Sequence, residues 1–85
     1  KDLKNIMNIQ DIYNSGNWYY AQALGKVGGG FGGAYTIIIA DNKKEAQEIG
    51  KRWIKNKYND LHLYKNNYKK EARGMLSAGN YLINQ

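Results

Sequence analysis

Lysines interleaved with tyrosines are the residues of this sequence whose types and spacing suggest a chemistry. Residues 43–85 carry ten Lys or Arg and four Asp or Glu, whereas residues 1–42 carry equal numbers of each sign. The net charge of +6 therefore belongs to the second half of the chain. Lysines can bind phosphates and tyrosines can stack on bases, a composition typical of proteins that bind RNA or single strands. An equally simple interpretation is a solvated surface with half-buried tyrosines.

The candidate nucleic-acid-binding residues come from two predicted helices and the segment between them. Lysines outnumber arginines eleven to two, which argues against bidentate recognition of bases. We therefore expect contact led by shape and charge, with weak sequence preference for RNA or DNA. An acidic partner protein is the alternative ligand. The candidate residues are Lys43, Lys44, Lys51, Arg52, Lys55, Lys69, Lys70, Tyr64 and Tyr68.

A glycine-rich stretch around Phe31 is the most unusual part of the sequence. Its glycines match G-x-G-x-x-G, but a dinucleotide site needs a helix directly after the loop, and a strand is predicted here. The stretch is therefore either a flexible hairpin tip with positive φ angles or a mobile finger that inserts Phe31 into a partner. The candidate partner-binding loop consists of Gly28, Gly29, Gly30, Phe31, Gly32 and Gly33.

Catalytic and metal sites find little support in the residue types. The chain has no cysteine, and His62, its single histidine, is flanked by leucines in a segment that alternates like a surface-facing strand. No set of nucleophile, base and orienting residue can be proposed from the spacing, and no close cluster of carboxylates suggests a metal. We therefore expect a non-enzymatic protein without a cofactor.

The compartment is suggested only by exclusions. The absence of cysteine fits a reducing compartment, so we expect a cytoplasmic protein. The longest uncharged apolar run, residues 34–40, is far shorter than the ~20 residues of a membrane helix, so no membrane partner is expected.

The predicted fold is organised around residues 17–58. Residues 18–24 are aromatic-rich and residues 34–40 contain three isoleucines, which predicts the two strands of an antiparallel hairpin. A helix is predicted over residues 42–58, and either Asp41 or Asn42 can be its N-cap; with Asn42 as the cap, Glu45 lies at the position of a capping box. Its apolar face repeats with the helical period and consists of Ala46, Ile49, Gly50, Trp53 and Ile54.

Shorter elements flank this unit. Residues 2–13 predict a short helix that stops at residues 14–16, although a strand is an alternative. Residues 61–64 alternate like a strand, residues 68–76 form a helical stripe, and residues 81–83 suggest an edge strand. One face of the hairpin should pack on the helices. The C-terminal segment or a partner should cover part of the other face, which leaves a homodimer open.

Residues 42–48 (NKKEAQE) follow a predicted strand and open a predicted helix, and in this they resemble the last helix of double-stranded-RNA-binding domains. Two lysines at that helix start contact phosphates in the family, and the resemblance gives this role to Lys43 and Lys44. The resemblance covers less than a quarter of the chain, and residues 40–42 replace the family's Gly-x-Gly-x-Ser lead-in. It is an analogy and not an assignment to the family.

Together these patterns predict a single α+β domain over residues 1–85. It has a short N-terminal helix, a β-hairpin with a glycine-rich tip, a main amphipathic helix packed on the sheet, and a basic C-terminal strand and helix. The predicted function is a small nucleic-acid- or polyanion-binding accessory protein that uses a lysine-rich helical face. The alternative is a protein-binding inhibitor or adaptor that uses the Phe31 loop. The Lys, Asn, Ile and Tyr bias suits an AT-rich bacterium or its phage.

Overall fold

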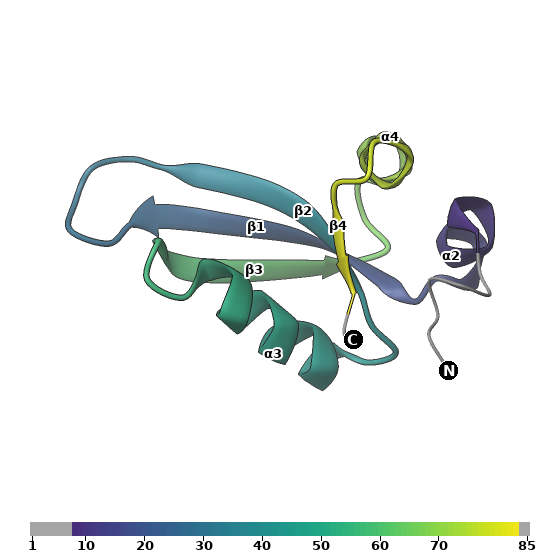
Figure 1. Ribbon diagram of the computed structural model, residues 1–85, viewed down its shortest axis with the longest axis horizontal. Coiled ribbons are helices and arrows are strands. Elements are labelled where there is room, and N and C mark those ends of the chain that lie inside the picture. The colour runs from purple at the N-terminus through teal and green to yellow at the C-terminus, as the bar shows by residue number, and fades with distance from the viewer. Residues whose placement is uncertain (1–7, 84–85) are drawn as a thin grey trace.

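The computed structural model describes residues 8–83, which form three helices and one four-stranded sheet (Figure 1). β1 and β2 form the predicted antiparallel hairpin, β3 adds antiparallel to β1, and β4 adds parallel to β2, so the strand order is β3-β1-β2-β4. The predicted α+β class is therefore confirmed. In chain order the elements are α2 (Ile9–Ser15), β1 (Trp18–Lys26), β2 (Gly33–Ile39), α3 (Lys43–Ile54), β3 (Tyr58–Lys65), α4 (Lys69–Ser77) and β4 (Tyr81–Ile83).

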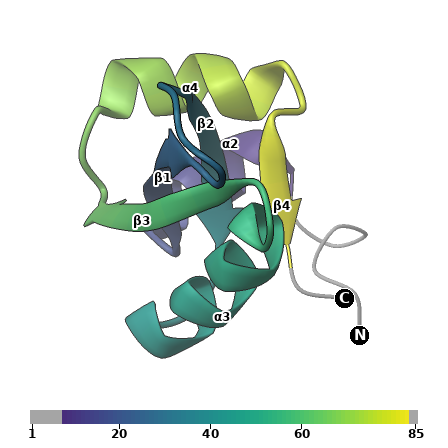
Figure 2. The same ribbon diagram turned by 90° about the vertical axis from the view of Figure 1, so that its left-hand side faces the viewer.

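The sheet lies between two layers of helices (Figure 2). α3 covers one face, and α2 and α4 cover part of the other. Successive side chains of a strand point to opposite faces, so Trp18 packs under α2 and α4 while Tyr19 packs under α3. Ile37 and Ile38 divide between the two cores in the same way. The sequence left two coverings open for the second face, the C-terminal segment or a partner, and the structure places α4 of the C-terminal segment there together with α2.

Trp18 is the centre of the core beneath α2 and α4, with 1% of its surface exposed. Its ring stacks on Tyr13 with the centroids 5.7 Å apart, and its Nε1–H donates to the Tyr13 carbonyl oxygen at 3.1 Å. Leu76 of α4 packs in the same core. Trp53, which the sequence places on the apolar face of the main helix, is partly buried against the core beneath α3. Trp18 thus ties two helices to the sheet.

The C-terminal end of α3 differs from the sequence prediction. The helix ends at Ile54 instead of Tyr58, because Lys55 adopts φ 27° and leaves the helical conformation. Tyr58 instead begins β3 and pairs with Lys26 of β1. β1 extends past residue 24, and β3 begins before residue 61. Each strand is longer than predicted because the other offers it a pairing partner there. Tertiary pairing therefore outweighs the local helical pattern at these residues.

The remaining boundaries lie close to the predicted ones. α2 ends at Ser15, and Gly16 has φ 75°, as expected for a glycine just past a helix end. Residues 2–7 of the predicted N-terminal helix lie outside the described residues. β2 is shifted by one residue, and the N–H of Ala40 after it donates to the carbonyl of Asn17. The predictions for α4 and β4 are confirmed.

Candidate functional site

The predicted nucleic-acid-binding lysines and arginine lie on two sides of the sheet. One group lies on α3 and at its C-terminal end, and the other lies in the first turn of α4 on the opposite face (Figure 2). All of these side chains are exposed. The groups are Lys43, Lys44, Lys51, Arg52 and Lys55 on the α3 side, and Lys69 and Lys70 on α4. The structure therefore does not bring the predicted set into one surface.

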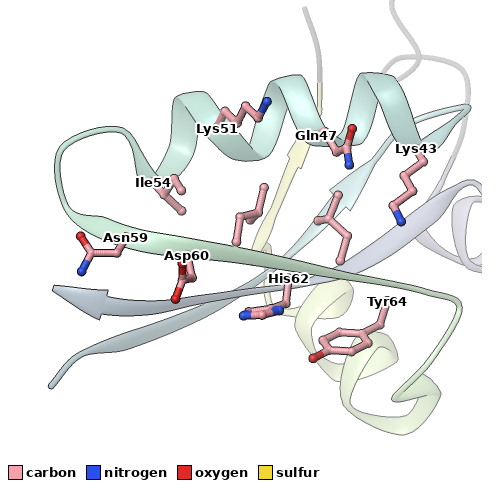
Figure 3. Close-up of a pocket in the computed structure, with 10 residues that line it drawn as sticks. Lys43, Gln47, Lys51, Ile54, Asn59, Asp60, His62 and Tyr64 are labelled. Carbon is pink, nitrogen blue, oxygen red and sulfur yellow. The ribbon is translucent and has the colours of Figure 1, made fainter. Parts of the chain in front are cut away.

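A groove follows β3, an edge strand of the sheet, on the side where it meets α3 (Figure 3). One wall is a row on α3 made of Lys43, Gln47 and Lys51, which share a helix face because they are spaced by four residues. Two helical turns separate the two lysines by about 12 Å along the axis. Residues 59–64 of β3 form the other wall, and the volume is about 610 Å³.

Gly50 allows α3 to lie close to β3. It is buried, and a Cβ atom added there would lie 2.6 Å from Leu61 Cδ2 and 3.3 Å from Ile38 Cδ1. A larger residue would therefore push Leu61 aside. Glycine in a helix interior costs roughly 1 kcal/mol relative to alanine, and the close packing offsets that cost. The lysine row is held beside the edge strand as a result.

The first turn of α3, which carries Lys43, is fixed by the predicted N-cap. Asn42 Oδ1 accepts from the backbone N–H of Glu45 at 2.9 Å, which confirms the capping role of Asn42. Glu45 Oε1 accepts from the N–H of Asp41 at 3.1 Å, so the reciprocal bond reaches one residue further back than a standard capping box. Such a cap contributes about 0.5–2 kcal/mol and positions the start of the lysine row.

Tyr64 connects the groove to a cluster of four tyrosines. Tyr20 is its centre, and its ring centroid lies 4.6 Å from that of Tyr68, 5.9 Å from that of Tyr35 and 6.5 Å from that of Tyr64. Tyr64 and Tyr68 meet edge to face at 5.5 Å. Tyr35 is 49% exposed and Tyr68 is 51% exposed. The cluster therefore presents two half-open aromatic rings to solvent.

Tyr68 and Tyr20 show how this cluster is held. Tyr68 has φ 56° and ψ 48°, a left-handed conformation that non-glycine residues adopt rarely and that is often found at functional sites. The pKa of Tyr20 is raised above its ordinary value, first by burial and then by the neighbouring Tyr35, Glu71 and Tyr68. Tyr20 is therefore a neutral phenol at neutral pH, and Glu71 is the acidic neighbour of the cluster.

The predicted partner-binding loop forms the tip of the β1–β2 hairpin, at the end of the molecule away from α2 and α4 (Figure 1). Gly28, Gly29 and Gly30 have φ angles of 90°, 98° and 86°, the left-handed region that favours glycine. Phe31 is 102% exposed, so its ring packs against nothing. Gly32 follows it and leads into β2, and a Cβ atom there would meet the side chain of Lys26.

His62 lies in β3 and is exposed, as the sequence predicts, and it borders the groove. Within residues 8–83, no group of three or more His, Asp or Glu side chains could hold a metal ion. The groove instead offers amide groups from Gln47 and Asn59, which can both donate and accept hydrogen bonds. These amide groups can therefore hold a polar ligand by hydrogen bonds.

Gln47, Tyr20 and Tyr35 were not among the residues predicted from the sequence. The four-residue spacing from Lys43 to Lys51 places Gln47 between them on one helix face, so this signal was present in the sequence. Tyr20 and Tyr35 come together only in the register that pairs Tyr20 with Ile37, two residues from Tyr35. Strand register cannot be read from alternation alone.

In comparisons with known proteins, no family model, no curated protein and no solved structure matches this chain. The likeness of residues 42–48 to double-stranded-RNA-binding domains therefore remains an analogy. Among the helices of residues 8–83, none has the length and apolar character needed to cross a membrane.

Proposed function

We propose that this protein binds single-stranded nucleic acid, without catalysis, along the groove between α3 and β3. The observation that carries the proposal is that Lys43 and Lys51 line the groove from α3, while Tyr64 borders it from β3 with its ring on the side of this strand that carries the tyrosine cluster (Figure 3). A lysine ammonium group binds phosphate as a point charge, and a tyrosine ring can stack on an unpaired base. A single strand needs both kinds of group along one path. Here that path crosses the edge strand β3, with the lysines on one side of it and the tyrosine ring on the other.

The α3 row would bind the phosphate backbone. Lys43 and Lys51 are separated by more than the distance between neighbouring phosphates, so each contacts a different part of the strand. The amide of Gln47 lies between them and can donate to a phosphate oxygen. Asp60 is the acidic residue among those that line the groove, and it lies opposite Leu24 toward the hairpin end of β3. The positive part of the groove is therefore the part near Tyr64.

The tyrosine cluster would bind the bases. Bases in a duplex are stacked on one another inside the helix, so only unpaired bases can reach Tyr68 and Tyr35. Glu71 lies beside the cluster and repels phosphate, whereas the two groove lysines attract it. This distribution of charge favours one orientation of the strand, with phosphates on the α3 side and bases on the tyrosine side.

The salt dependence of binding tests the proposal. Fluorescence anisotropy with a labelled single-stranded octamer should give an affinity that falls roughly tenfold between about 50 and about 200 mM salt, because two or three phosphate contacts each contribute about −0.7 to the log–log slope. A duplex of the same length should bind more weakly. Absence of single-strand binding at the lower salt concentration, or preference for the duplex, would contradict the proposal.

A second candidate function rests on the exposure of Phe31. An exposed phenylalanine at the tip of a hairpin is typical of a residue that anchors a protein partner in an apolar pocket. Val27 at the same tip is also exposed. In this alternative, the hairpin tip makes the protein an inhibitor or adaptor, and the glycines let the tip adjust to its partner.

Phe31→Ser separates this alternative from a simple connector. Because the ring packs against nothing, the variant should change the free energy of unfolding by less than about 0.5 kcal/mol. Partner capture from a nuclease-treated bacterial lysate should be lost if the tip is the anchor. If the parent and Phe31→Ser capture equal amounts of partner protein, the glycine-rich loop only connects β1 and β2 and is not the anchor.

A further inference from the structure

A second cavity, shallow and widely open to solvent, lies between α4 and the β1–β2 hairpin, on the tyrosine side of the sheet. Its volume is about 480 Å³, and Tyr20 and Tyr35 form its sheet wall while Gly74 and Met75 of α4 form part of the other. The Tyr20 ring also contacts Tyr64, which borders the α3–β3 groove. A pair of contacting rings therefore links the two cavities.

The lining of this cavity suits a flat aromatic group with a hydrogen-bond donor. Two aromatic rings and a methionine side chain offer apolar contact, and a Cβ atom at Gly74 would meet nothing within 4 Å, so space remains beside the helix. Glu71 is the ionisable group of the α4 wall, and its carboxylate only accepts hydrogen bonds when charged. Neither lysine nor arginine lines the cavity, so a phosphate would be repelled.

Building on the proposed function, we propose that this cavity binds one base of the same single strand and that Glu71 makes it favour bases with an exocyclic amino group. The exocyclic amino group of cytosine can donate to a carboxylate, whereas thymine has at the same position a carbonyl oxygen that cannot donate. The tyrosines provide stacking that any base can use. Preference at this position therefore comes from Glu71 and not from the rings.

Octamers of deoxycytidine and deoxythymidine test this inference, because the two bases differ in the group that faces the carboxylate. At neutral pH and fixed salt, the deoxycytidine octamer should bind roughly three- to tenfold more tightly, the range expected for a partly solvated hydrogen bond to a charged group. Glu71→Gln should bring the two affinities together. The loss of one negative charge acts on both octamers alike, so the ratio of their affinities isolates the contact with the base. Tyr35→Ala should weaken binding of both octamers roughly fivefold or more.

The outcomes separate this inference from the function on which it rests. Equal binding of the two octamers by the parent protein, or a cytosine preference that survives Glu71→Gln, would overturn the base pocket and leave the α3–β3 groove as the binding site. If the cavity instead holds a cationic side chain of a partner protein, the ratio of the two octamer affinities should be the same in the parent and in Glu71→Gln. That result would also overturn the base pocket. Failure of both octamers to bind would overturn the proposed function itself. Because Glu71 is exposed, the variant should keep the parent's circular dichroism spectrum.

Discussion

Replacing Trp18 by alanine is expected to lower the free energy of unfolding by about 3–5 kcal/mol, the largest effect of any single substitution proposed for this protein. The side chain is 1% exposed, so its removal leaves a cavity among Ile12, Ile37 and Leu76. The Tyr13 carbonyl also loses its indole donor. A domain of this size has a total stability of about 4–13 kcal/mol, so the variant should lose a large share of it. Chemical denaturation followed by circular dichroism measures the loss.

Trp53→Ala is the matched control for this substitution. The same atoms are removed, but Trp53 is only partly buried against the opposite core, so its loss should cost clearly less. Trp53 also lies on α3, which leaves the contacts among the sheet, α2 and α4 intact. A cost at Trp53 equal to or larger than that at Trp18 would show that the core beneath α2 and α4 is not the more tightly packed of the two.

Reversing the two groove lysines together, Lys43→Glu with Lys51→Glu, is expected to weaken single-strand binding by at least about tenfold and to flatten the salt dependence. Both side chains are exposed and line the groove, so the change removes two phosphate contacts and replaces them with repulsion. The fold should be retained, because neither side chain belongs to a core cluster. Fluorescence anisotropy at two salt concentrations measures both effects.

The control pair is Lys69→Glu with Lys70→Glu on α4. This variant has the same net charge as the groove variant, but its substitutions lie outside the α3–β3 groove, on the side of the sheet that carries the tyrosine cluster. It should weaken binding clearly less than the groove variant does, because Lys69 and Lys70 add to the overall positive charge without lining the groove. An equal loss in the two variants would mean that binding depends on overall charge alone, or that Lys69 and Lys70 belong to the binding site, as predicted from the sequence.

Local patterns in the sequence predicted most of the fold. Asn42 marks the start of α3 because its side chain satisfies a free N–H, and Gly16 marks the end of α2 because it adopts a positive φ. Both effects involve residues close together in sequence. The predicted end of α3 was wrong because Tyr58 belongs to β3, where it pairs with Lys26. That contact joins residues far apart in sequence, so no local pattern reveals it.

The site was predictable in its residue types but not in its arrangement. The lysines and tyrosines were identified from composition, yet helix periodicity gives no information on which face of a sheet a helix covers. The separation of Lys69 and Lys70 from the α3 row follows from that choice of face. The tyrosine cluster depends on strand order, since Tyr20 meets Tyr64 only because β3 lies next to β1 and not beside β2.

The most direct test of the central claim, that one strand is bound between the α3 lysine row and the tyrosine cluster, is an NMR titration of the backbone amides with a single-stranded octamer. The account predicts shifts in residues 43–51 of α3, residues 59–64 of β3, and Tyr68. Shifts confined to the hairpin tip around Phe31, or to the outer surface of α4 at Lys69 and Lys70, would contradict it.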